Sequence, residues 1–133
     1  MPASIETEET INVGVKVLVE SISRVNDYGV MFEDDGETGY FYAFELGADD
    51  YNILDAMHIY NVVSVVDRKK PSLLQVAWSE DGLKVALIIN GSPHAIVDFE
   101  IKRGYCRTNF PSPDRSWTSF THEWSDAAFD PFC

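Results

Sequence analysis

The chain has 133 residues, and 22 Asp and Glu against 10 Lys and Arg give it a formal net charge of −12. This length predicts a single domain over residues 1–133, large enough to bury a core without disulfides or metals. A surface this acidic repels phosphate backbones, so nucleic acid is not an expected partner.

The first half of the chain alternates between apolar and polar residues, as strands do. Residues 1–11 are polar and are expected to be flexible, and a first strand is predicted over 12–21. Strands at 28–34 and 40–46 flank residues 35–39, whose Asp and Gly residues predict a hairpin turn. Residues 49–60 predict a short helix capped by Asp49 or Asp50, with Ile53, Leu54 and Met57 on one face.

The second half begins with a β-branched strand predicted at 58–66, followed by a loop at 68–71 that Pro71 ends. Strands at 73–79, 83–89 and 94–101 are separated by short turns, which is typical of an antiparallel meander. Residues 104–133 are rich in aromatics and prolines and predict an irregular C-terminal wrap with one helical turn at 125–129. The expected fold is therefore mainly β (β-rich α+β), with six or seven antiparallel strands, a short helix and the aromatic wrap.

Charge is unevenly distributed along the chain. Between Arg24 and Arg68 there are ten acids and no base, a net charge of −10, while the remaining twelve acids and ten bases sum to −2. One interpretation is a solvated, solubilising face, and the other is a surface that attracts a basic partner.

Three segments have distinctive sequences: residues 32–43, residues 53–62 and residues 71–111. The last of these contains the motifs Trp78-Ser-Glu-Asp-Gly82 and His94-Ala-Ile-Val-Asp-Phe99. Together they resemble a family of small uncharacterised bacterial proteins classed as a domain of unknown function. The resemblance spans roughly residues 13–124 and implies a bacterial origin and a compact fold. It implies no activity and no catalytic residue.

Candidate chemistry comes mainly from the meander. On the predicted strand 94–101, His94, Asp98 and Glu100 share a face, which places the two carboxylates about 7 Å apart, within reach of paired-carboxylate hydrolysis. The alternative is a solvent face opposite buried Val97 and Phe99. Cys106 beside two arginines favours a thiolate, with His94 or His122 as its base. The alternative is a small buried hydrophobe.

Neither a cofactor nor a metal is expected, because the three histidines are scattered and no ligand-spaced motif or phosphate loop occurs. The C-terminal aromatics are typical both of recognition surfaces and of a cover over a sheet. No signal peptide or apolar span is visible, and the two cysteines do not predict a disulfide framework, so a cytoplasmic protein without a membrane partner is expected.

The leading hypothesis is a non-enzymatic module, inhibitor-like or immunity-like, whose acidic face binds a basic protein. The residues predicted to carry this contact are Asp34, Asp35, Glu37, Asp49 and Asp50. The alternative is a small enzyme or ligand-binding domain whose sheet-lined pocket contains Tyr40, Tyr42, His94, Asp98 and Cys106. The oligomeric state stays open.

Overall fold

The computed structural model describes residues 3–132. Its elements, in chain order, are the strands and the two short 3-10 helices β1 (Ala3–Ile11), β2 (Val17–Ile22), β3 (Tyr28–Asp34), β4 (Thr38–Leu46), β5 (Tyr51–Asn61), η1 (Val62–Ser64), β6 (Ser72–Ser79), β7 (Lys84–Ile89), β8 (Ser92–Asp98), β9 (Arg103–Cys106) and η2 (Asp126–Phe132).

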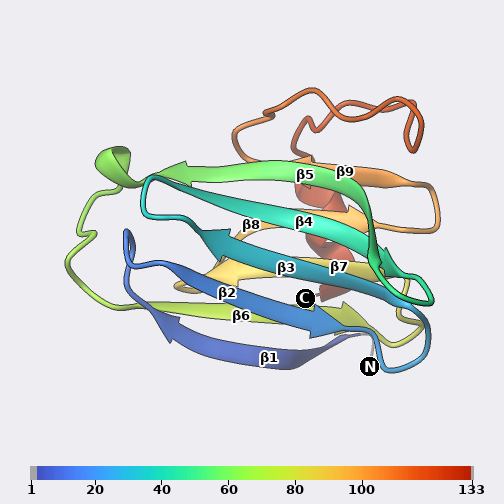
Figure 1. The fold of residues 1–133 in the computed structure, drawn as a ribbon, viewed down its shortest axis with the longest axis horizontal. Coiled ribbons are helices and arrows are strands. Elements are labelled where there is room, and N and C mark those ends of the chain that lie inside the picture. The colour runs from blue at the N-terminus through green and yellow to red at the C-terminus, as the bar shows by residue number, and fades with distance from the viewer. Residues whose placement is uncertain (1–2, 133) are drawn as a thin grey trace.

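The strands form two antiparallel sheets (Figure 1). Sheet A has the order β1-β6-β7-β8-β9, and sheet B has the order β2-β3-β4-β5. The chain starts in sheet A, runs through sheet B as a meander, and returns to place β6 beside β1. The expectation of a mainly β, antiparallel fold is confirmed. The hairpins at 28–46 and 72–89 pair strands that follow one another directly in the chain.

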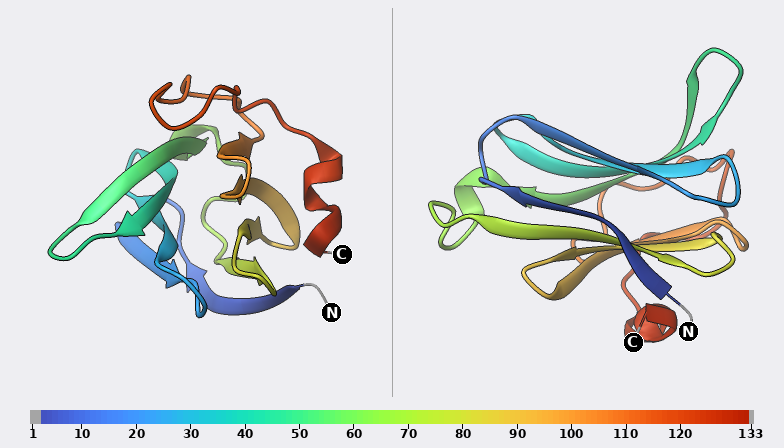
Figure 2. Two further views of the ribbon diagram at one scale, coloured as in Figure 1. Left: turned by 90° about the vertical axis from the view of Figure 1, so that its right-hand side faces the viewer. Right: turned by 90° about the horizontal axis from the view of Figure 1, so that it is seen from below.

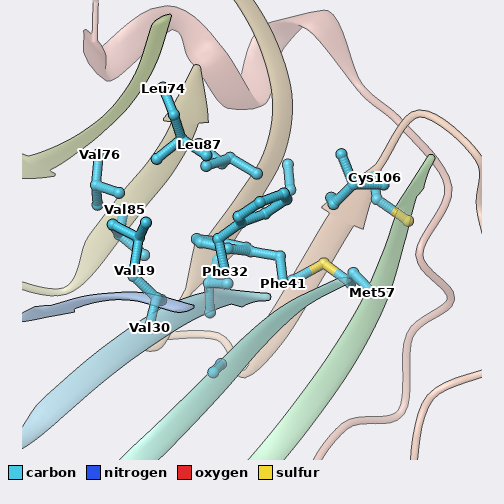
Figure 3. Packing of buried hydrophobic residues seen from close by; sticks show 14 of the residues in the cluster. Val19, Val30, Phe32, Phe41, Met57, Leu74, Val76, Val85, Leu87 and Cys106 are labelled. Atoms are coloured by element: carbon cyan, nitrogen blue, oxygen red, sulfur yellow. The ribbon is translucent and has the colours of Figure 1, made fainter. Parts of the chain in front are cut away.

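The core lies between the two sheets, where the alternating apolar residues of both meet. Figure 3 shows Val19, Val30, Phe32, Phe41 and Met57 of sheet B facing Leu74, Val76, Val85, Leu87 and Cys106 of sheet A. One buried polar contact also crosses this layer, because the Trp78 indole donates to the Ser21 hydroxyl at 2.9 Å.

A second, smaller apolar cluster lies on the outer face of sheet A. Ala86, Ile96 and Tyr105 are buried there beneath Trp124, Phe129 and Phe132 of the C-terminal segment. In the left view of Figure 2, η2 lies on the side of sheet A that faces away from sheet B. The C-terminal aromatics in this cluster therefore cover a sheet, and the predicted helical turn near residue 125 is found as η2.

Three segments differ from the sequence-based expectations in kind. Residues 3–11, expected to be flexible, form β1 and pair with β6 from Ala3–Ser79 to Ile11–Ser72. Residues 49–60, expected to hold a helix, belong mainly to β5, whose partner is β4. Residues 104–106, expected to belong to the irregular C-terminal wrap, lie in β9 and pair with β8. All three errors have one cause: hydrogen bonding to a neighbouring strand overrides weak local preference.

Three strand boundaries also differ. The first predicted strand begins at Val17, because Gly14, with φ +92°, and the Asn12–Val15 hydrogen bond form a turn. The strand predicted at 58–66 ends at Asn61, and the strand predicted at 94–101 runs from Ser92 to Asp98. The Asp98 side chain accepts from the backbone amide of Glu100 at 3.0 Å, which closes a turn there. Asp98 and Glu100 consequently do not lie along one strand.

Within residues 3–132, no helix has the length and apolarity that crossing a membrane would need.

Candidate functional site

The outer face of sheet B is built from side chains that alternate with the core residues of β2–β5. Strand register aligns them in three rows across the sheet. We call this surface the open face, and its rows are Leu18–Glu33–Tyr40–His58, Glu20–Met31–Tyr42–Ala56 and Ile22–Gly29–Phe44–Ile53.

The open face is partly apolar and carries no Lys or Arg. Leu18 is 58% exposed and Ile53 is 49% exposed, whereas Phe44 is fully buried under the ring of Tyr51, with the two ring centroids 4.5 Å apart. Apart from the Phe110 ring, whose centroid lies 6.0 Å from that of His58, the described C-terminal segment does not pack over this face, in contrast to the outer face of sheet A (Figure 2). Its acids are Glu20 and Glu33, and neither takes part in an ion pair within the described residues.

Four of the five acids predicted to bind a partner are exposed, at opposite ends of the open face. Asp35 and Glu37 lie in the β3–β4 turn, and Asp49 and Asp50 lie in the β4–β5 turn. The nine residues of β4 that separate the two turns span about 30 Å. The acids therefore flank the open face rather than forming one patch.

Asp34, which was predicted to belong to that surface, lies outside it. Its side chain points into the core side of sheet B and the residue is 1% exposed. It accepts from the backbone amides of Gly14 and Gly36, both at 2.8 Å, and from the Tyr60 hydroxyl at 2.6 Å. Burial, and then the bond to Asp34, raise the pKa of Tyr60, so this hydroxyl stays a donor. Asp34 joins two turns to β5 and has a structural role.

The residues of the alternative pocket do not converge. Tyr40 and Tyr42 lie on the open face, Asp98 caps the β8–β9 turn, and Cys106 is fully buried in the core between the sheets. The prediction that the Asp98 and Glu100 carboxylates share one face of a strand is wrong, because the strand ends at Asp98 and Glu100 lies in the turn that follows.

His94 lines a cavity that measures about 480 Å³. The cavity opens beside the loop between η1 and β6, and Tyr60, Asn90 and Lys70 also line it. Burial, followed by the charge of Arg107, lowers the pKa of His94 from its usual 6.5, which favours a neutral imidazole. No described residue hydrogen-bonds to the His94 ring.

His122 makes a different contact from the one expected, and sequence reasoning missed its partner. Its Nε2 lies 2.8 Å from Asp55 Oδ2, and its Nδ1 lies 2.6 Å from the carbonyl oxygen of Pro111. Both ring nitrogens are thus occupied, and neither activates Cys106. The His122 and Asp55 side chains are 0% and 1% exposed, and a Cβ at Gly104 would lie 2.6 Å from Asp55 Oδ2.

The bond between His122 and Asp55 attaches the C-terminal segment to sheet B. The His122 carbonyl also accepts from the Cys106 amide at 3.0 Å, so the residue bridges β5 and β9. Because the Pro111 carbonyl can only accept, Nδ1 of His122 carries a proton. A second proton lies in the hydrogen bond between Nε2 and the Asp55 carboxylate. This enclosed pair therefore has a structural role, and its burial leaves no room for a substrate. Across the described chain, no group of three or more His, Cys, Asp or Glu side chains is arranged to hold a metal.

The open face was missed because its members have no shared motif. The alternation in 17–22, 28–34 and 38–46 assigns each residue to one of two faces, and this signal was present in the sequence. Which face stays uncovered depends on where the C-terminal segment packs, and that is a long-range property.

Comparison with known proteins gives a family but no activity. Residues 11–133 match the model of a family described as "Uncharacterized protein conserved in bacteria (DUF2251)". A protein of Haemophilus influenzae, itself named only "Uncharacterized protein", is 40% identical over 114 residues, which cover 84% of this chain and 71% of the relative. No solved structure matches the chain. The resemblance drawn from residues 13–124 is thus confirmed, and this chain belongs to the DUF2251 family of conserved bacterial proteins.

Proposed function

We propose that this protein is a non-enzymatic binding module whose open face contacts a basic protein. The observation that carries the proposal is that four strands present a largely uncovered, partly apolar face whose two acids form no ion pair and whose rows contain no Lys or Arg. Apolar contacts supply binding free energy, and unopposed acids select and attract a partner with positive charge.

The size of the surface fits a modest interface. Three rows of side chains across four strands cover about 400 Å², and the acidic turns at both ends extend this to about 600 Å². Stable interfaces bury about 800 Å² on each partner, so the expected complex is a transient one. Charge then contributes mainly to the rate of association, which salt reduces.

The test is charge reversal at two matched positions. Glu33→Lys lies on the open face, and Glu80→Lys lies in the turn after β6, so each variant changes the net charge by +2. The immobilised proteins are exposed to bacterial lysate at low salt and eluted with a salt gradient. We expect one basic protein that the native chain and Glu80→Lys retain and that Glu33→Lys loses. Equal retention by all three, or retention that 0.5 M salt leaves unchanged, contradicts the proposal.

A second candidate function is small-molecule binding in the cavity beside His94. Its volume of about 480 Å³ lies within the usual range for ligand sites, and the His94 ring is without a partner there. The walls are apolar at Val13, Val65 and Ile89, which suits a ligand with an apolar body and one hydrogen-bonding group. A thermal-shift screen of such compounds against the native chain and His94→Phe tests this function. Stabilisation that disappears in His94→Phe supports it, and no stabilisation by any compound contradicts it.

A further inference from the structure

The open face has one place where aromatic rings and a carboxylate meet. Tyr40 and Tyr42 project side by side from β4, with ring centroids 6.0 Å apart and planes inclined by 23°. Glu33 lies opposite Tyr40 in the register of β3 and β4. Burial, and then the charge of Glu33, raise the pKa of Tyr42, in keeping with the position of this carboxylate beside the tyrosine.

Elsewhere in the molecule, aromatic rings already hold guanidinium groups. Arg103 lies 4.5 Å from the ring centroid of Tyr105 and 4.8 Å from that of Phe120, and Arg107 lies 3.9 Å from the ring of Trp124. All three contacts are on the side of sheet A and the C-terminal segment. Among the described residues, no Lys or Arg stacks on Tyr40 or Tyr42.

Neither of the two cations nearest in sequence to this face forms an ion pair with Glu33, although Lys16 and Glu33 line the same surface hollow. Arg24 pairs with Glu6 at 3.0 Å, and the Lys16 side chain extends beside Gly36 at the β3–β4 turn. The tyrosine pair and Glu33 therefore present π faces and a carboxylate that forms no ion pair with a described Lys or Arg.

His58 adds an acceptor to the same row. Its Nε2 lies 3.0 Å from Asn61 Oδ1, so Nε2 carries the proton and Nδ1 presents a lone pair. Nδ1 is buried without a hydrogen-bond partner in the described chain, between the rings of Tyr40 and Phe110. Of these two rings, that of Phe110 is 56% exposed.

An arginine side chain matches this chemistry better than a lysine does. Its planar guanidinium stacks on an aromatic face and at the same time donates two parallel hydrogen bonds to a carboxylate. A lysine ammonium is a compact, strongly hydrated charge that gains less from the rings. We propose that Glu33, Tyr40 and Tyr42 form a recognition site for an arginine side chain of the basic partner. This inference rests on the proposed function and assigns its central contact.

The experiment compares hexa-arginine and hexa-lysine peptides, which carry equal charge, by titration into ¹⁵N-labelled protein at low salt. We expect the arginine peptide to bind about threefold or more tighter, as cation–π contacts at exposed sites predict. Its amide shift changes should centre on Glu33, Tyr40 and Tyr42.

Variants separate the rings from the charge. Replacing both tyrosines by leucine (Y40L with Y42L) keeps the net charge and should bring the two peptides to equal affinity, whereas F120L on the other side of the molecule should keep the preference. Glu33→Gln should weaken the arginine peptide more than Asp50→Asn does, although each removes one charge. If the double variant does not fold, the native peptide ratio and the Glu33→Gln comparison decide.

The two possible failures differ. Equal, salt-sensitive binding of both peptides by the native protein overturns the arginine site and leaves an acidic binding face intact. Binding of neither peptide overturns the proposed function together with the inference.

Discussion

Buried carboxylates hold distant parts of this protein together. Asp34 accepts three hydrogen bonds from two turns and β5, and Asp55 accepts from His122, 67 residues away. A buried charge is tolerated only when it is paired or fully hydrogen-bonded, and both residues meet that condition. Two of the ten acids between Arg24 and Arg68 thus stabilise the fold and add nothing to the surface.

The Asp55–His122 pair gives a prediction about stability. Asp55→Ala and His122→Ala should each cost about 3–5 kcal/mol of unfolding free energy, because each leaves a buried polar partner uncompensated. The double variant should cost much less than the sum, since the interaction can be lost only once. Urea unfolding of the three variants measures this. Additive costs would show that the two side chains are not coupled.

His94 gives a prediction about pH. Its pKa is lowered from 6.5 in the folded protein, so below pH 6.5 the unfolded chain takes up this proton first. Stability should therefore fall as the pH drops from 6.5 toward the folded-state pKa, and His94 should have no such effect above pH 6.5. His94→Gln removes this component, so the native chain should lose stability relative to the variant between pH 7.5 and pH 5.5. Parallel curves in urea unfolding would contradict the assignment.

At the scale of elements, the two sheets have unlike outer faces. The C-terminal segment buries Ala86, Ile96 and Tyr105 on sheet A, while the open face of sheet B is largely uncovered. The segment itself is attached along its length: the Thr108 hydroxyl donates to the His58 carbonyl, the Phe110 carbonyl accepts from the His58 amide, and His122 bonds to Asp55. These bonds lie along the edge of β5, and on its outer face the Phe110 ring contacts His58.

This asymmetry predicts that replacing Phe132 and replacing Phe110, both in the C-terminal segment, lower the free energy of unfolding by different amounts. Phe132→Ser removes part of the cover over sheet A and should cost about 1–2 kcal/mol, since the side chain is partly buried in an apolar cluster. Phe110→Ser removes a ring that is 56% exposed and should cost less. Chemical unfolding compares them, and a larger cost for Phe110→Ser would mean that the C-terminal helix contributes little to the fold.

At the scale of the whole molecule, net charge and charge placement act in opposite directions. A formal charge of −12 is self-repelling, so screening should stabilise the folded protein, whereas screening weakens the attraction of a basic partner. Between 10 mM and 500 mM NaCl, we expect the melting temperature to rise and the affinity for the hexa-arginine peptide to fall. Thermal unfolding and peptide titration in the same buffers check this. A melting temperature that falls with salt would show that the acids are net stabilising.

The sequence by itself determined the β class, the turns within residues 35–39 and 80–82, and the two-residue alternation of the central strands. These properties are local: turn residues and strand periodicity act over a few positions. The helix predicted at 49–60 failed because the spacing of Ile53, Leu54 and Met57 suits a helix, while the partner strand β4, which decides the outcome, is not visible in that window.

The candidate site shows the same division. Composition revealed an acidic module, but only the tertiary structure separated the exposed Asp35, Glu37, Asp49 and Asp50 from buried Asp34, and brought Asp55 to His122. It also decided that β1 pairs with β6 and that the C-terminal segment covers sheet A and not sheet B. These outcomes depend on contacts between residues far apart in the chain, where burial and strand pairing outweigh every local preference.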